Sequence, residues 1–153
     1  MVFYVPFVPT PQKVVNAMIE MAMLTPKDSV IEIGAGDARL MIAASKYVPA
    51  HRITGYEIAR PVWILGKLRL WITGVNAHLL CRDFRHVDLS GADVIFCYLS
   101  PRMMHHVASH IVPKLAPGTR IVSHGFPLPG HTPVQKNIIM ISRRRARVFL
   151  YVI

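Results

Sequence analysis

The sequence predicts an α/β domain built on a doubly wound, mostly parallel sheet, and three observations support this prediction. Apolar runs of strand length alternate with helix-like segments along the chain, which is typical of βαβ units. A glycine-rich turn at residues 34–36 directly follows the first of these strand-like runs, as in folds that bind a ligand at that turn. The 153 residues are 52% apolar and only 17% charged, enough to bury a sizeable core. We therefore expect one domain over residues 1–153.

The first predicted element is a helix near the amino terminus. Thr10 has the residue type of a helix N-cap, and Pro11 suits the first helical position. The apolar residues that follow recur at helical spacing and mark one buried face: Val14, Val15, Met18, Met21 and Ala22.

The remaining predicted strands and helices alternate as a parallel sheet requires. Pro113 is expected to disturb the end of the helix predicted at 102–115, and Trp63 and Trp71 are expected to face the core from the helix predicted at 61–73. Residues 137–153 predict a hairpin with a basic turn. Strands are expected at 29–33, 52–58, 78–82, 93–98 and from 120 to 123, and helices at 38–47, 61–73 and 102–115.

Charge and composition limit the classes of function. The formal net charge is +10, and no acidic residue follows Asp93, which favours polyanions, acidic proteins or anionic membrane surfaces as partners. No apolar run reaches the roughly 18 residues of a membrane span, and the opening lacks the basic start of a signal peptide. We expect a cytoplasmic protein with no transmembrane segment. Cys81 and Cys97 are too few for a disulfide framework or a zinc site, and both are expected to be buried thiols.

The turn after the first strand carries the chemical signal. It contains Gly34, Ala35 and Gly36, with Glu32 before it and Asp37 directly after it. A dinucleotide-binding turn would have a third glycine where this chain has an arginine, and the two carboxylates would repel a pyrophosphate. The same carboxylates would attract a cationic ligand.

Two further acids follow the next predicted strands. Glu57 closes the second strand, from where its carboxylate can accept both ribose hydroxyls. Asp83 ends the third strand, where it can accept a hydrogen bond from an adenine amino group. A nucleoside that is cationic and lacks phosphate is S-adenosylmethionine, and the sequence predicts it as the cofactor.

The chain resembles the small class I methyltransferases, including the archaeal broad-specificity protein-lysine methyltransferases and the mitochondrial lysine methyltransferases of the ATP synthase c-subunit and adenine nucleotide translocase. The resemblance covers nearly the whole chain. It rests on residues 5–10, 32–40 (EIGAGDARL), 55–57, 94–96, 101–104, 117–124 (PGTRIVSH) and 149–153.

The resemblance implies a Rossmann-like seven-stranded sheet whose last two strands form the basic hairpin, one of them antiparallel. It also implies site roles: the methionine moiety beside Glu32 and the glycine turn, the ribose on Glu57, and the adenine beside Asp83 and Phe84. Thr10 and the prolyl segment before it would close over the cofactor. The chain departs from the family at two positions: Ala38 replaces a frequent glycine, and Gly125 replaces a larger residue.

The residues after the fourth strand are the candidates for orienting a substrate. Tyr98 and Ser100 stand where many amine methyltransferases carry Asn/Asp-Pro-Pro-aromatic. Because that motif is missing, methylation of adenine or glutamine is disfavoured. We expect an S-adenosylmethionine-dependent methyltransferase acting on a lysine side chain of a protein. The alternatives are a methyltransferase of nucleic acid or of a small molecule, and a cofactor-binding protein without catalysis.

Two clusters outside the turn could bind other ligands. His106 and His110 have the i, i+4 spacing of a metal pair, but no third ligand is evident, so no metal is expected. The basic run of the tail could contact nucleic acid or could form a solvated turn: Arg143, Arg144, Arg145 and Arg147.

Overall fold

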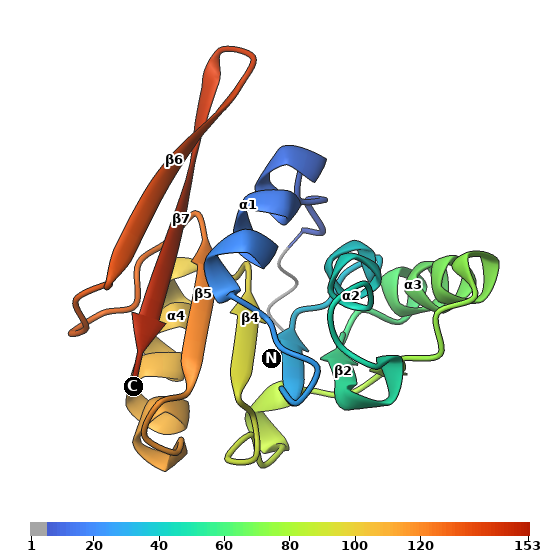
Figure 1. Ribbon diagram of the computed structural model, residues 1–153, viewed down its shortest axis with the longest axis horizontal. Coiled ribbons are helices and arrows are strands. Elements are labelled where there is room, and N and C mark those ends of the chain that lie inside the picture. Colours follow the sequence, from blue (N-terminus) through green and yellow to red (C-terminus); the bar gives the residue numbers. More distant parts are fainter. Residues whose placement is uncertain (1–5) are drawn as a thin grey trace.

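The computed structural model describes residues 6–153, and Figure 1 shows one twisted sheet with helices on both faces. Val5, the first residue of the prolyl segment, lies outside the described residues. The seven strands have the order β3-β2-β1-β4-β5-β7-β6, which confirms the predicted sheet. The strands are β1 (Val30–Ile33), β2 (Ile53–Tyr56), β3 (His78–Leu80), β4 (Val94–Cys97), β5 (Arg120–His124), β6 (Gln135–Ile141) and β7 (Arg144–Val152).

The topology creates a crevice beside β1. Strands β1 to β5 are parallel, and β1 pairs with β2 on one side and with β4 on the other. Glu32 lies in register with Gly55 of β2 and Phe96 of β4. After β1 the chain continues to β2 on one side of the sheet, whereas after β4 it continues to β5 on the other side. Ligands of such sheets bind at the carboxyl ends of the strands where the order reverses in this way.

Alternate residues of the central strands supply two cores. Val94 and Phe96 of β4 face the helices α1, α2 and α3, whereas Ile95 and Cys97 face α4. This period of two follows from strand geometry. The helices are α1 (Gln12–Ala22), α2 (Arg39–Ala44), α3 (Arg60–Thr73) and α4 (Pro101–His106).

The helix ends differ from the sequence predictions in three places. The first helix begins at Gln12 after Pro11, and Thr10 is not its N-cap. The second helix is shorter than residues 38–47. The helix expected at 102–115 is broken into α4, a π-turn at Val107–Ile111 and a 3₁₀ turn at Val112–Lys114. Pro113 explains the last break because it has no N–H to continue the helical ladder.

The C-terminal hairpin is confirmed, with β7 antiparallel to both β5 and β6. It extends well past the rest of the sheet, alongside α1 (Figure 1). Among the described residues no helix is long and apolar enough to cross a bilayer.

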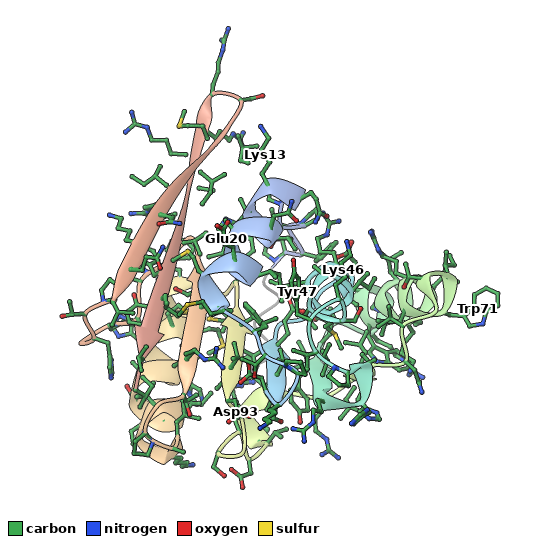
Figure 2. The ribbon with its side chains drawn as sticks, viewed as in Figure 1. Lys13, Glu20, Lys46, Tyr47, Trp71 and Asp93 are labelled. Carbon is green, nitrogen blue, oxygen red and sulfur yellow. The ribbon has the colours of Figure 1, made fainter. Side chains whose placement is uncertain are left out.

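Two burial predictions are wrong. Cys97 is buried as expected, but Cys81 is exposed. Trp63 packs against the core and its indole Nε1 donates to the carbonyl oxygen of Leu79 at 3.0 Å, whereas Trp71 is 80% exposed. Figure 2 shows Trp71 projecting away from the sheet.

Candidate active site

A cavity of about 800 Å³ opens at the carboxyl ends of β1, β2 and β4. It lies at the crevice that the topology creates, and its size suits a nucleoside-sized ligand. All the candidate site residues from the sequence line it: Thr10, Glu32, Gly34, Ala35, Gly36, Asp37, Glu57, Asp83, Phe84, Tyr98 and Ser100.

The glycine turn forms the floor of the cavity. The N–H groups of Gly34 and Ala35 both donate to the carbonyl oxygen of Tyr56, each at 2.9 Å, which ties the turn to β2. Gly36 has a φ of +56°, and a Cβ there would lie 2.6 Å from Cε2 of Phe7. Glycine at position 36 therefore allows both the left-handed backbone and the close approach of Phe7. Ala38 is also left-handed, with a φ of 63°, a backbone conformation that glycine adopts at a lower cost than alanine.

Glu57 is held in place by two backbone donors. Its Oε2 accepts from the N–H of Gly36 at 2.9 Å, and its Oε1 accepts from the N–H of Ala59 at 2.8 Å. One donor belongs to the glycine turn and the other to the residue before α3. Because each carboxylate oxygen can accept a second hydrogen bond, Glu57 retains acceptor capacity toward the cavity.

Glu32 is the least compensated group of the site. Its Oε2 is buried and has no hydrogen-bond partner. Burial raises the pKa of the carboxyl well above its usual value, and the nearby negative charges of Asp37 and Glu57 raise it further. An unpartnered buried acceptor is costly unless a ligand satisfies it. The position therefore suits a cationic hydrogen-bond donor.

Asp37 has protein partners of its own, which the sequence analysis did not foresee. Its carboxylate forms ion pairs with Arg39 at 2.6 Å and with Arg69 of α3 at 2.8 Å. Burial favours a higher pKa, but the hydrogen bonds from Arg39 and the charges of both arginines outweigh burial and lower the pKa of Asp37. Arg39 also donates to the carbonyl oxygen of Thr10 at 2.9 Å, so this cluster holds the amino-terminal segment over the cavity.

Asp83 is also paired. Arg85 donates to both of its oxygens, from Nε at 3.0 Å and from Nη2 at 2.5 Å, and these hydrogen bonds lower the pKa of Asp83. The adjacent Phe84 is buried and lies edge-on to His106 at 6.4 Å between ring centroids. The pair therefore supplies a carboxylate and an aromatic surface at the end of β3.

The opposite wall of the cavity is formed after β4 and β5. Ser100 is the N-cap of α4, and its hydroxyl accepts from the N–H of Met103 at 3.4 Å. The ring of Tyr98 lies 4.0 Å from that of His124, centroid to centroid. A Cβ on Gly125 would lie 3.1 Å from Cε2 of Tyr98, so the glycine leaves room for the tyrosine ring. Burial lowers the pKa of His124 to about 4, which leaves its ring neutral at physiological pH.

Several lining residues were not candidates from the sequence. Phe7 and Phe126 add aromatic surface to the cavity, and Met103 adds aliphatic surface. Phe7 falls in the prolyl segment that the resemblance included, so a signal existed for it. No sequence pattern marks Phe126, which reaches the cavity because Gly125 turns the chain with a φ of +85°.

His106 and His110 stack face to face, 4.5 Å apart and with an interplanar angle of 11°. Over residues 6–153 no group of three or more His, Cys, Asp or Glu side chains is arranged to hold a metal ion. The pair lies beside the helix break at Val107, and neither histidine lines the cavity, although His106 contacts the lining residue Phe84.

Comparison with known proteins assigns the family. The ANTKMT methyltransferase domain matches residues 32–135, which include the glycine turn and most of the cavity lining. The chain belongs to this methyltransferase family. It is therefore an S-adenosylmethionine-dependent enzyme, as the carboxylates at residues 32–57 predicted.

The relatives of this methyltransferase match most of its length. A protein-lysine N-methyltransferase from Saccharolobus islandicus (strain REY15A) is 34% identical over 98% of this chain and 94% of its own length. The human lysine N-methyltransferase of the ATP synthase c-subunit is 28% identical over 84% of this chain, and the match spans 54% of that protein. An RNA methyltransferase from Salinibacter ruber, solved with S-adenosyl-L-homocysteine, superposes with a TM-score of 0.84. It is 27% identical over 95% of this chain and 93% of its own.

Proposed function

We propose that this protein is a protein-lysine N-methyltransferase that uses the cavity to bind S-adenosylmethionine. The similarity to the Saccharolobus islandicus enzyme, which extends over 98% of this chain, carries the choice of lysine. The cavity supports the choice of cofactor because its unpartnered buried acceptor, Oε2 of Glu32, suits an ammonium group. The fit therefore rests on a defined atom as well as on a fold.

The roles of the cofactor-binding residues follow from their positions. Glu32 and the turn at residues 34–36 would hold the methionine moiety, and Glu57, fixed by two backbone N–H groups, would accept from the ribose hydroxyls. Asp83 and Phe84 would border the adenine. Thr10, which Arg39 ties to Asp37, would close the cavity at its amino-terminal side.

Asp37 has a different role in this proposal. Its charge is neutralised by Arg39 and Arg69, so its electrostatic contribution to a cationic ligand is small. Its carboxylate instead joins the glycine turn to α3 and to the segment that contains Thr10. We therefore propose that Asp37 maintains the shape of the site.

When bound, S-adenosylmethionine supplies an electrophilic methyl group. The protein must then align a neutral amine with that group and exclude water. A lysine ammonium with the reference pKa of about 10.4 costs on the order of 4 kcal/mol to deprotonate near pH 7.4. Burial lowers the pKa of an amine. The apolar wall of Tyr98, Leu99 and Phe126 would reduce this cost by desolvating the incoming side chain.

Tyr98 and Ser100 are the groups that we propose orient the amine. Tyr98 is positioned by the His124 ring, which lies against its own, and Gly125 leaves space for it because a Cβ there would crowd the tyrosine ring. The Ser100 hydroxyl accepts from the backbone of α4 and keeps its own hydrogen for a second partner. Both residues line the same cavity as the cofactor-binding carboxylates.

The experiment is to incubate the purified protein with methyl-labelled S-adenosylmethionine and a cell lysate, and then to digest parallel samples with protease and with nuclease. We expect protease to release the label and acid hydrolysis to recover it as methyl-lysine. The control is the same incubation with Glu57→Ala, which should incorporate far less label. Label that only nuclease releases would contradict the proposal.

A methyltransferase of nucleic acid is the second candidate. The likeness to the Salinibacter ruber RNA methyltransferase favours it, as do the four exposed arginines of the hairpin. The nuclease arm of the experiment tests this candidate directly. A small-molecule substrate would leave no label on any macromolecule.

A further inference from the structure

Helix α3 exposes a wide apolar face to solvent. The exposed apolar residues follow one another at intervals of one, three, three and one positions along the chain. This spacing places them on one side of the helix. Their exposed fractions are 55% for Ile64, 43% for Leu65, 48% for Leu68, 80% for Trp71 and 68% for Ile72.

The other side of α3 is already used for packing. Gly66 and Leu70 are buried, and a Cβ on Gly66 would lie 2.6 Å from Cδ2 of Leu79 in β3. Trp63 is fixed to the same strand by its indole hydrogen bond. The exposed apolar face therefore points away from the sheet, and no rotation of the helix can bury it without exposing the packed side. Figure 2 shows Trp71 at the outer end of this helix.

This pattern is the reverse of an ordinary surface helix, which presents polar residues to water. Contiguous exposed apolar surface on a folded domain marks an interaction site. It also explains why the sequence prediction for Trp71 was wrong: apolar residues occur on both sides of α3, and their periodicity alone cannot tell which side faces the sheet.

The charges around the face indicate the chemistry of its partner. Residues 58–82 contain four Lys and Arg and no Asp or Glu. Arg69 is paired with Asp37, but Arg60 and Lys67 are exposed and form no ion pair with the described residues. Two copies docked through α3 would bring these cations together without a carboxylate on either helix to pair with them. The charge therefore favours an anionic surface over a second copy of the chain.

We propose that α3 docks the protein on the surface of an anionic lipid bilayer. The exposed stripe of α3, with its tryptophan and the cations beside it, presents the side chains by which interfacial helices contact a bilayer, while the other side of the helix packs against the sheet. Ile64, Leu68 and Trp71 enter the boundary between headgroups and acyl chains, and Lys67 lies at the lipid phosphates. With 14 residues α3 lies on the bilayer rather than across it.

Docking would place the active site beside the membrane. Ala59, Arg60 and Pro61, at the amino end of α3, also line the cavity. The same helix, α3, therefore contributes both to the cavity lining and to the exposed apolar face. This proposal stands on the exposed face of α3 and does not depend on which molecule the enzyme methylates.

The test is co-sedimentation of the whole protein with vesicles of pure phosphatidylcholine and with vesicles that contain about one third phosphatidylglycerol. We expect binding to the anionic vesicles and little to the neutral ones. Leu68→Ser with Trp71→Ser should weaken binding at least tenfold, since both variants remove an apolar side chain that would enter the interface. Lys67→Glu should weaken binding to the anionic vesicles alone.

The matched control is Ile138→Ser with Met140→Ser on β6, which removes two apolar side chains that are 54% and 52% exposed. It should leave vesicle binding unchanged. A brominated lipid should quench the fluorescence of the wild type but not that of Trp71→Phe, whose remaining Trp63 packs against the core. This readout and Lys67→Glu keep the test decisive if the serine pair fails to fold.

Three results would overturn the proposal. The first is absence of binding to anionic vesicles. The second is an equal loss of binding in the β6 control, which would make the contact a property of the basic, apolar surface in general. The third is a wild-type dimer in sedimentation velocity that Leu68→Ser with Trp71→Ser dissociates, which would make the partner a second copy of the chain.

Discussion

Glu32 shows how one side chain can limit stability and serve binding. Its carboxyl has a pKa well above its usual value because it is buried near two other acids, and its Oε2 has no partner. In the cofactor-free protein the folded state therefore favours the protonated acid. The contribution of Glu32 to stability is fully present below the pKa of an unfolded glutamate and is lost as pH rises through the raised pKa.

The first prediction concerns pH and cofactor binding. A bound ammonium group favours ionised Glu32, so S-adenosylmethionine binding should release a proton, and affinity should rise with pH until it levels off above the raised pKa. Calorimetry in buffers of different ionisation enthalpy measures this release. Glu32→Gln should abolish it, weaken binding and stabilise the cofactor-free protein at neutral pH. Proton uptake, or no difference between the two proteins, would refute the role of Glu32.

The second prediction concerns the glycine turn. Gly36→Ala adds a Cβ at a left-handed φ and 2.6 Å from Phe7, which should lower the free energy of unfolding by about 1–3 kcal/mol. Gly91→Ala is the control because nothing lies within 4 Å of its added Cβ. Urea unfolding measures both variants. Equal stability of the two would show that the turn tolerates a side chain.

At the scale of elements, the sheet was predictable and several helix details were not. The strands are short apolar runs bounded by turn residues, and the two cores follow from their alternation. Glu32 and Glu57 could be placed in the site because each lies in or directly after a recognisable strand. The pairing of Asp37 with Arg69 could not be predicted, because tertiary packing brings together two residues that lie 32 positions apart in the sequence. The break after α4 begins before Pro113, so the proline accounts for only part of it.

Arg120 provides the third prediction, because it joins β5 to the end of α1. Its Nη1 donates to the carbonyl oxygens of Ala22 and Met23 at 2.6 and 2.9 Å, and its Nη2 pairs with Asp28 at 2.5 Å. Arg120→Ala should cost about 2–4 kcal/mol of unfolding free energy, since it leaves Asp28 and two carbonyls without this partner. Chemical denaturation measures the loss. Arg144→Ala on the exposed hairpin is the control, and a similar loss there would show that the Arg120 contacts are not what stabilises this junction.

At the scale of the whole molecule, the net charge is +10, and two groups of its exposed cations lie on the hairpin and on α3. The turn of the hairpin, with four exposed arginines at and beside it, extends past the carboxyl ends of the parallel strands, whereas α3 packs beside β3, at the other end of the strand order (Figure 1). The two surfaces differ in character, because the hairpin turn is basic whereas the exposed face of α3 is apolar with cations beside it.

The fourth prediction separates the hairpin from the site. Replacing all four of its arginines with glutamine should weaken binding to RNA or to acidic proteins, more strongly at low salt, because the contacts are electrostatic. The affinity for S-adenosylmethionine should not change. Filter binding and calorimetry measure the two effects, and an equal fall in cofactor affinity would mean that the hairpin supports the fold of the site. The variants are Arg143→Gln, Arg144→Gln, Arg145→Gln and Arg147→Gln.

The function of the whole molecule depends on the carboxylates at the carboxyl edge of the sheet, which we expect to hold S-adenosylmethionine. A calorimetric titration of the cofactor into the wild type, Glu57→Ala and the exposed control Asp88→Ala tests this expectation. We predict one site per chain, and in Glu57→Ala a loss of roughly 2–4 kcal/mol of binding energy, as expected for a charged, bidentate contact. Asp88→Ala should bind as the wild type does. Equal affinity of all three proteins would show that the cofactor binds without this carboxylate.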